Sequence, residues 1–288
     1  MRIGIDGRML GNTGIGRYLR NLIIHLAQLD TQNEYVVFIN DENTQGVKQE
    51  NFEFVTLNPP IPIYSPGEQY RLPFVINRWK PDVMHYPNFD IPLVQSCPYL
   101  VTIHDLIYYL YPEQCPSKIA HYYARFMLKY ATQHAQMIIT VSQHSKRDLL
   151  KYVQVPEKKL QVVWQAAEKN YTPKQHSGQI KSTMPQKYGI TRPYILYVGK
   201  HHPYKNIKQL LRAYVKYDDI YRAFHLVIAG KRDERRNDLY EYAKALDPLG
   251  HIYFTDSVPD KELVPLYQEA SLFVFPSLYE GNTNRLAS

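Results

Sequence analysis

The sequence has few cysteines and no long apolar run. Only Cys97 and Cys115 occur among 288 residues, which is too few for a disulfide framework and suits a reducing compartment. No apolar stretch approaches the roughly 20 residues that cross a bilayer, and Asp6 lies where a secretion signal would be apolar. We therefore expect a cytoplasmic protein.

The sequence also lacks the signatures of several enzyme and binding classes. There is no Gly-x-Ser-x-Gly elbow, no His-Glu-x-x-His motif, no Cys-x-x-Cys pair and no set of kinase motifs. His201 and His202 are adjacent and have no evident carboxylate or cysteine partner, which argues against a metal site. The basic residues are dispersed and accompany no DNA- or RNA-binding motif, so we expect no nucleic-acid partner.

What is present is the composition of a globular protein with about two domains. Hydrophobic residues make up 44% of the chain and charged residues 21%, and 288 residues is long for a single core. The net charge of +7 favours anionic partners such as nucleotide phosphates or lipid head groups. This charge permits peripheral contact with the inner face of a membrane, although no amphipathic basic helix is conspicuous.

Short β-rich runs alternate with helical patterns along the whole chain, which is typical of parallel βαβ units. We predict a first domain over residues 1–170, a linker rich in proline and glycine over 171–191, and a second domain over 192–288. The strands of the first sheet are predicted at 2–6, 35–40, 83–86, 99–103, 137–141 and 161–163. Those of the second are predicted at 194–198, 224–229, 252–254 and 272–275.

Three segments carry apolar residues with a helical period, and we expect each of these stripes to pack against a sheet. The first belongs to a helix that Pro116 and Ser117 can start. The stripes are Ile119, Tyr122, Tyr123, Phe126, Met127, Tyr130 and Ala131; Ile207, Leu210, Leu211 and Tyr214; and Leu263, Leu266, Tyr267 and Ala270.

Two junctions in the first domain carry candidate functional residues where a strand ends. Gly14 and Gly16 lie between the first strand and a helix, where glycines let the backbone approach a phosphate or simply form a tight turn. His104 directly follows the strand at 99–103, where its ring can hydrogen-bond a substrate hydroxyl, transfer a proton or serve a structural role.

Two junctions in the second domain add charged candidates. Lys200 and Lys205 follow the strand at 194–198, at the start of a helix whose dipole already favours a diphosphate, although surface lysines are also common there. Glu280 stands beyond the last predicted strand, where a carboxylate can accept hydrogen bonds from sugar hydroxyls.

Taken together and in this order, these junctions resemble the large retaining glycosyltransferase family with the GT-B fold, family four or group 1. The resemblance covers nearly the whole chain. It implies an α/β fold of two Rossmann-like domains with parallel sheets facing a cleft. The residues that carry it are 3–8 with 14–18, 102–106, 140–145, 197–199 with 203–206, and 276–281.

The resemblance also implies roles for individual residues. Gly14 and Gly16 would lie against the phosphate of a GDP- or UDP-linked sugar, Lys200 and Lys205 would neutralise the leaving diphosphate, and His104 would act beside the transferred sugar. Glu280 would be the first carboxylate of the family's Glu-x7-Glu motif, which holds the donor. The family needs no bound metal as a cofactor. A mannose or glucose unit would pass, with retention, to a glycan or lipid-linked acceptor, in cell-surface polysaccharide biosynthesis.

The end of the sequence departs from the family pattern. Ser288 occupies the position of the second glutamate, so we expect an incomplete second domain that binds donor poorly and turns over little. Two alternatives to a transferase stay open. One is a non-catalytic binding module or truncated fragment of the same fold, and the other is a nucleotide-sugar epimerase, which would convert the donor without an acceptor.

Overall fold

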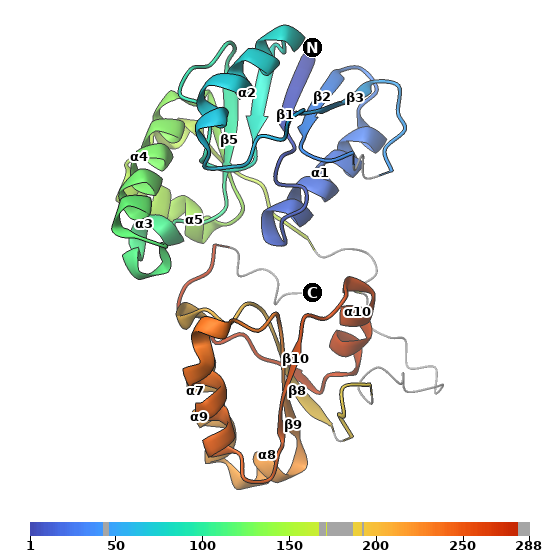
Figure 1. Cartoon of the computed structure of the whole chain (residues 1–288), viewed down its shortest axis with the longest axis vertical. Helices are drawn as coiled ribbons and strands as arrows, with labels where there is room; N and C mark the ends of the chain where they lie inside the picture. The colour runs from blue at the N-terminus through green and yellow to red at the C-terminus, as the bar shows by residue number, and fades with distance from the viewer. Residues whose placement is uncertain (43–45, 167–170, 172–186, 192, 282–288) are drawn as a thin grey trace. The chain divides into compact units, whose positions relative to one another are not determined.

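The computed structural model describes residues 1–42, 46–166, 171, 187–191 and 193–281 (Figure 1). The chain divides into two compact units. The first spans Met1–Ala166 and takes in Gly281, and the second spans Ala167–Glu280. Most of the predicted linker, and the tail at 282–288, lie outside the described residues.

The first unit is built on a parallel sheet of seven strands in the order β3-β2-β1-β4-β5-β6-β7. Chain order reverses once, between β1 and β4. All six predicted strands are present, and the seventh, β3, was not predicted. The strands are β1 (Arg2–Asp6), β2 (Glu34–Ile39), β3 (Phe52–Thr56), β4 (Val83–Tyr86), β5 (Tyr99–Ile103), β6 (Met137–Thr140) and β7 (Leu160–Val162).

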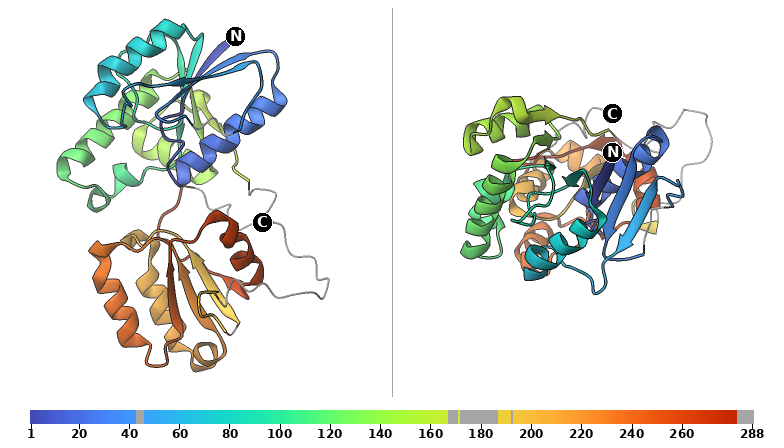
Figure 2. Two further views of the ribbon diagram at one scale, coloured as in Figure 1. Left: turned by 45° about the vertical axis from the view of Figure 1, so that its right-hand side comes forward. Right: turned by 90° about the horizontal axis from the view of Figure 1, so that it is seen from above.

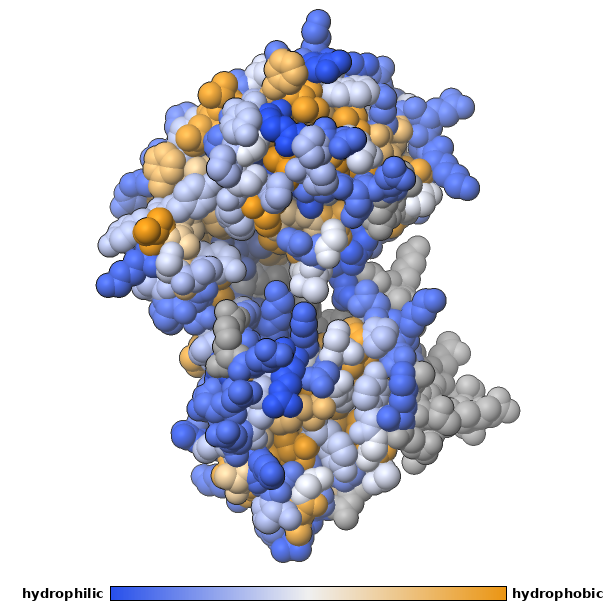
Figure 3. All heavy atoms as spheres, in the orientation of Figure 1, coloured by the Kyte–Doolittle hydropathy of each residue, from blue (hydrophilic) through white to orange (hydrophobic). Residues whose placement is uncertain are grey.

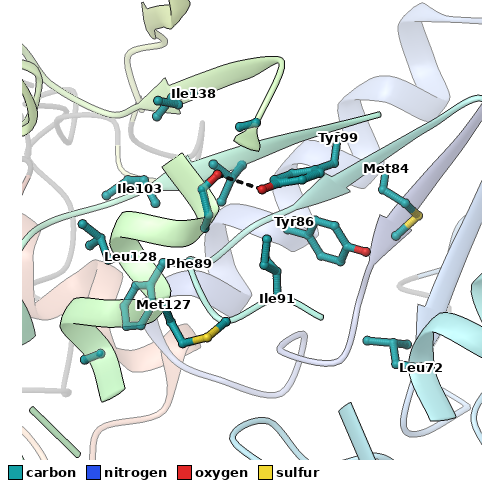
Figure 4. Packing of buried hydrophobic residues seen from close by; sticks show 14 of the residues in the cluster. Leu72, Met84, Tyr86, Phe89, Ile91, Tyr99, Ile103, Met127, Leu128 and Ile138 are labelled. Carbon is teal, nitrogen blue, oxygen red and sulfur yellow. Dashed lines mark hydrogen bonds between the residues drawn. The ribbon is translucent and has the colours of Figure 1, made fainter. Parts of the chain in front are cut away.

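Helices cover both faces of this sheet, each over its own apolar cluster. Helix α1 (Gly14–Leu29) packs Leu19, Ile23 and Ala27 onto one face. The other face carries α2 (Pro66–Trp79) and α4 (Lys118–His134), over the larger cluster shown in Figure 4. There the hydroxyl of Tyr99 donates to the carbonyl of Ala131 at 2.9 Å. The remaining helical segments are α3 (Ile107–Leu110), η1 (Pro112–Gln114), α5 (Gln143–Asp148), its π-helical continuation η2 (Leu149–Val153), and η3 (Glu157–Lys159).

Helix α4 begins as predicted but buries only part of the predicted stripe. The hydroxyl of Ser117 accepts from the backbone N–H of Ala120 and so caps the first turn. Of the predicted stripe, Met127 and Ala131 are buried, whereas 81% of Ile119, 69% of Tyr122 and 55% of Phe126 are accessible to solvent. Small residues allow the buried face to approach the sheet closely. That buried face consists of His121, Ala124, Met127, Leu128, Ala131 and Thr132.

The second unit repeats this plan with four parallel strands in the order β10-β9-β8-β11. In Figures 1 and 2, α7 and α9 lie on one side of the sheet and α10 on the other. The four predicted strands are all present as β8 (Tyr194–Val198), β9 (His225–Ala229), β10 (Ile252–Asp256) and β11 (Leu272–Phe273). The helices are η4 (Pro203–Lys205), α7 (Ile207–Lys216), α8 (Asp218–Ala223), η5 (Glu234–Arg236), α9 (Asn237–Leu246) and α10 (Asp260–Glu269).

The stripe predicted for α7 is confirmed, because Ile207, Leu210, Leu211 and Tyr214 are all buried. In α10, Leu266 is buried and Tyr267 and Ala270 pack against the cluster around it, together with Ile190 from the end of the predicted linker. In the part of the chain that the structure describes, no helix is both long and apolar enough to cross a membrane.

Candidate functional site

Each predicted site residue follows a strand near the point where the strand order of its sheet reverses. That strand either borders the reversal point or lies one strand away from it. In open parallel sheets, ligands bind outside the carboxyl ends of the strands at such a point. In the first sheet the reversal lies between β1 and β4, and in the second between β8 and β11. Gly14 and Gly16 follow β1, His104 follows β5, Lys200 and Lys205 follow β8, and Glu280 follows β11.

Gly14 and Gly16 open helix α1 but face different surroundings. A side-chain carbon at position 14 would meet nothing within 4 Å. At position 16 it would lie 2.6 Å from the carbonyl oxygen of Leu10 and 2.8 Å from that of Met9. Gly16 is therefore required for the packing of the loop on the helix, whereas only Gly14 has free space in front of it.

This difference predicts opposite outcomes for two alanine variants. Gly16→Ala should lower the free energy of unfolding by about 1–3 kcal/mol, because backbone atoms must move. Gly14→Ala should change it by less than about 1 kcal/mol, because no atom is displaced. Urea denaturation of both variants measures this. If Gly14→Ala weakens nucleotide-sugar binding at unchanged stability, position 14 lies against the donor; equal stability losses for the two variants would contradict the assignment.

His104 lies in a small aromatic and polar cluster that the sequence did not predict. Its ring meets Tyr18 edge to face, with 4.9 Å between the ring centroids. The Tyr18 hydroxyl lies 3.1 Å from Oγ1 of Thr102, and that oxygen lies 2.8 Å from Nε2 of His85. Tyr18 lies in α1, His85 in β4 and Thr102 in β5, so these three elements together fix the surroundings of His104.

The protonation of His104 follows from its contacts. Its Nε2 lies 3.0 Å from the carbonyl oxygen of Pro87, and a carbonyl oxygen can only accept. Nε2 therefore carries the hydrogen. Burial lowers the pKa of His104 to about 4, so the ring is neutral at pH 7 and Nδ1 carries a free lone pair. Burial also lowers the pKa of His85 to about 4, and nearby His104 adds to this effect.

The lowered pKa of His85 predicts how stability changes with pH. In the unfolded chain a histidine titrates near pH 6.5, so between about pH 6.5 and 4 unfolding takes up a proton. Stability should thus fall as pH is lowered through this range, by up to about 3 kcal/mol for His85.

Glu68 changes stability in the opposite direction over part of the same range, because burial raises its pKa. The informative quantity is therefore the difference between the wild type and His85→Asn, measured by denaturant unfolding at several pH values. His134→Asn, an exposed change on α4, is the control. A difference that does not depend on pH would show that His85 is not held neutral.

A buried charge network adjoins the end of β1 and was also missed. The Arg8 guanidinium donates to both carboxylate oxygens of Asp6, at 2.9 and 2.7 Å, and to Glu68 at 3.0 Å. At most 6% of any of these three side chains is exposed. Glu68 opens helix α2, so the network ties this helix to the β1 loop.

In the second unit, the structure brings Lys205 and Glu280 together. The ammonium of Lys205 donates to Oε1 of Glu280, and the two side chains are only 12% and 17% exposed. The same nitrogen lies 4.8 Å from the centre of the Tyr204 ring and 5.0 Å from that of Phe275. Two aromatic faces and a carboxylate thus hold one cation beside the reversal point, where it can meet an anionic ligand.

The neighbouring loops meet through two glycines, and Lys200 stands apart from the ion pair. A side-chain carbon at Gly230, after β9, would lie 2.0 Å from the carbonyl oxygen of Gly199, after β8. Only glycine fits at position 230.

The Lys200 side chain is exposed, and its backbone carbonyl accepts from the Tyr197 hydroxyl at 3.1 Å. The structure therefore groups Lys205 with Glu280 but not with Lys200.

Two family profiles together match most of the chain. The profile of Glycosyltransferase Family 4 matches residues 12–166, and that of Glycosyl transferases group 1 matches residues 181–282. The chain belongs to glycosyltransferase family 4. It is thus a hexosyltransferase by family, and the profiles include the loops that carry Gly14, His104, Lys205 and Glu280.

Relatives and solved structures of similar fold extend the comparison. O-antigen chain mannosyltransferase B of Escherichia coli is 28% identical over 287 residues, covering 93% of this family 4 chain and 74% of that protein. O-antigen chain mannosyltransferase RfbU of Salmonella typhimurium is 27% identical, covering 67% of this chain and 49% of that protein.

Among solved structures, Anabaena Alr3699/HepE in complex with UDP and glucose matches with a TM-score of 0.70 and 16% identity, covering 99% of this chain and 77% of that one. WaaG, a glycosyltransferase involved in lipopolysaccharide biosynthesis, matches with a TM-score of 0.68 and 14% identity, over the same shares. At these identities the likeness establishes the fold, which is GT-B.

Proposed function

We propose that this chain transfers a hexose of the mannose or glucose class from a GDP- or UDP-linked donor to a glycan or lipid-linked acceptor. The configuration at the anomeric carbon is retained, and the product enters cell-surface polysaccharide. Family membership and the names of the O-antigen mannosyltransferase relatives support mannose as the first sugar to test. We place the reaction in the cytoplasm or at the inner face of the membrane.

The observation that carries the proposal is the pair of Lys205 and Glu280 at the reversal point of the second sheet. A nucleoside diphosphate gains a further negative charge as its bond to the sugar breaks, and Lys205 supplies a cation to stabilise that charge without a metal. Glu280 then becomes available to accept hydrogen bonds from sugar hydroxyls. On the first sheet, neutral His104 offers a lone pair to a hydroxyl of the sugar or the acceptor.

Product analysis tests the proposal. The full chain is incubated with GDP-mannose or UDP-glucose, with and without a lipid extract from bacteria that make surface polysaccharide. Transfer that needs the extract, with the donor's anomeric configuration kept in the NMR spectrum, is the expected result. A stereoisomer of the donor formed without the extract would replace the proposal with an epimerase. Failure to bind either donor in calorimetry would favour a non-catalytic module.

A further inference from the structure

Tyr64, in the loop before α2, has its backbone in the left-handed region, with a φ of 58°. An aromatic residue keeps that conformation where its surroundings hold it, and residues held in this way gather at ligand-binding sites. Here two buried carboxyl groups hold it. The backbone N–H of Tyr64 donates to Oδ2 of Asp90 at 2.9 Å and to Oε2 of Glu68 at 3.2 Å. Tyr64 is nevertheless 49% exposed.

Glu68 and Asp90 share a proton. Both residues are buried, and their carboxyl groups hydrogen-bond each other. Such a bond requires a hydrogen on one of the two groups, because a carboxylate only accepts. Burial, and to a smaller extent the Asp90 charge, raises the pKa of Glu68 to about 8, although Arg8 opposes the change. At pH 7, Glu68 is therefore the protonated member of the pair.

The bonds at each oxygen agree with this assignment. Oε2 of Glu68 accepts from Arg8 and Tyr64. Among the described residues no donor reaches its Oε1, as expected of an oxygen that carries the hydrogen. Asp90 accepts from Tyr64 at Oδ2 and from the Tyr123 hydroxyl at Oδ1, the latter at 2.7 Å. One proton thus joins the start of α2 to the loop after β4, and the Tyr64 backbone lies between them.

The side chains that this arrangement presents are tyrosine rings. Tyr64 and Tyr123 meet edge to face, with 6.3 Å between the ring centroids, and 37% of Tyr123 is exposed. The Asn88 amide donates to the Tyr64 hydroxyl at 3.4 Å. Asn88 belongs to the loop after β4, and in the same loop the carbonyl of Pro87 binds His104. The rings therefore adjoin the loop that orients His104, at the reversal point of the first sheet.

A sugar ring suits this surface better than a purely apolar ligand. In the view of Figure 3, apolar side chains of the first unit are scattered among hydrophilic ones. Sites for small ligands combine aromatic faces with a few polar groups that fix orientation. A pyranose has an apolar ring face and a rim of hydroxyls, and Tyr64 with Asn88 offers a partner to each.

We propose that the Glu68–Asp90 pair, with one proton between its two carboxyl groups, positions Tyr64 as part of the binding site for the acceptor sugar. The Tyr64 ring covers one face of a pyranose, while its hydroxyl and the Asn88 amide bond the sugar hydroxyls. Glu68 and Asp90 are too buried to touch the sugar, so they are positioning residues. The inference rests on the proposed function for the existence of an acceptor, and it adds which residues recognise that acceptor.

Loss of the shared proton should release Tyr64 at alkaline pH. Once Glu68 ionises, Arg8 is the cation that faces the carboxylates of Asp6, Glu68 and Asp90, and the bond between Glu68 and Asp90 is replaced by repulsion. The titratable and charged groups around Glu68 and Tyr64 are Asp6 and Arg8 after β1, Asp90 after β4, Tyr108 in α3 and Tyr123 in α4.

Steady-state kinetics at pH 7 and pH 9 tests the shared proton, with the donor and the lipid extract that support transfer. About nine-tenths of Glu68 is ionised at pH 9, so half-saturation by the extract should rise about tenfold. In Glu68→Gln the rise should be less than about twofold. Glutamine donates to Asp90 and accepts from Arg8 and Tyr64 at every pH, as protonated glutamate does at pH 7. Equal pH responses of the two proteins would overturn the inference.

A second variant tests the ring itself. Tyr64→Ala should raise half-saturation by the extract about tenfold at pH 7, because an aromatic contact with the sugar is lost. Half-saturation by the donor should stay within about twofold. Tyr70→Ala is the matched control, because Tyr70 is an exposed tyrosine on α2, and this variant should change neither value. A Tyr64→Ala enzyme in which only the donor binds more weakly would assign the ring to the donor and overturn the inference.

A measurement without donor separates this inference from the transferase proposal. Saturation-transfer NMR with the methyl glycosides of mannose, glucose, galactose and N-acetylglucosamine detects sugar contact without turnover. At least one glycoside should respond with the wild type, and about threefold less with Tyr64→Ala. Circular dichroism confirms that each variant is folded.

The outcomes of the two experiments differ for the two proposals. Transfer with unchanged half-saturation by the extract in Tyr64→Ala would overturn this inference and leave the proposed function standing. Glycoside binding that depends on Tyr64, in a chain that transfers nothing, would support the Tyr64 sugar site and overturn the proposed function. No response from any of the four glycosides would count against the site.

Discussion

Replacing Lys205 with alanine should lower the rate of sugar transfer by about two to three orders of magnitude. Removing one group that stabilises transition-state charge typically has an effect of this size. The change leaves the Glu280 carboxylate without its cation, beside the place where the diphosphate would sit. Both side chains are more than 80% buried, so little water screens the Glu280 carboxylate. Without Lys205, this carboxylate would therefore repel the negatively charged diphosphate.

Steady-state kinetics with whichever donor supports transfer measures this effect. Lys208→Ala is the matched control, because Lys208 lies three residues on, pairs with Asp238, and is 42% exposed. Its loss should change the rate less than about threefold, as exposed pairs contribute little. Glu280→Gln should weaken donor binding more than it lowers the maximal rate. A Lys205→Ala enzyme that keeps the control's rate would remove the basis of the proposed function.

The second large effect concerns folding. Arg8→Met should lower the free energy of unfolding by about 3–5 kcal/mol, because it leaves the buried Asp6 carboxylate without its cation and removes a hydrogen-bond donor from Glu68. Burial already raises the pKa of Glu68 to about 8 despite Arg8, which shows how poorly this environment solvates a charge. Urea denaturation at neutral pH measures the loss.

Arg2→Met provides the comparison, because Arg2 pairs with Glu34 on the surface, where the two side chains are 43% and 64% exposed. That change should cost less than about 1 kcal/mol. Adding Asp6→Asn to Arg8→Met should recover part of the stability, since the unpaired carboxylate is removed. A cost for Arg8→Met no larger than that for Arg2→Met would mean that the network does not hold α2 to the β1 loop.

The strand pattern and the candidate loops could be predicted because both depend on local sequence. Each predicted strand is an apolar run bounded by polar or turn-forming residues, and the site residues lie in or just beyond the loops that follow such runs. Strand β3 was missed because Glu53 interrupts its apolar residues and it pairs only with β2, at the edge of the sheet. The family resemblance added the ordering of the loops.

What could not be predicted depends on contacts between distant residues. Apolar residues occur around most of α4, so periodicity alone does not tell which of them meet the sheet. The small side chain of Ala124, outside the predicted stripe, allows close approach on the face that is buried. Glu68 lies 60 residues beyond Arg8, and nothing in either local sequence connects them. The pairing of Tyr18 with His104 also spans two elements, although both residues stand beside predicted junctions.

The hydrogen bond from His104 to Pro87 fixes the direction of any further bond that this ring makes. The remaining nitrogen is an acceptor only, so whatever approaches it must bring its own hydrogen. A hydroxyl satisfies that condition, and replacing it with fluorine or a methyl ether does not. In the transfer that we propose, with His104 beside the sugar, the imidazole would therefore discriminate among sugars that differ by a single substituent at the position it faces.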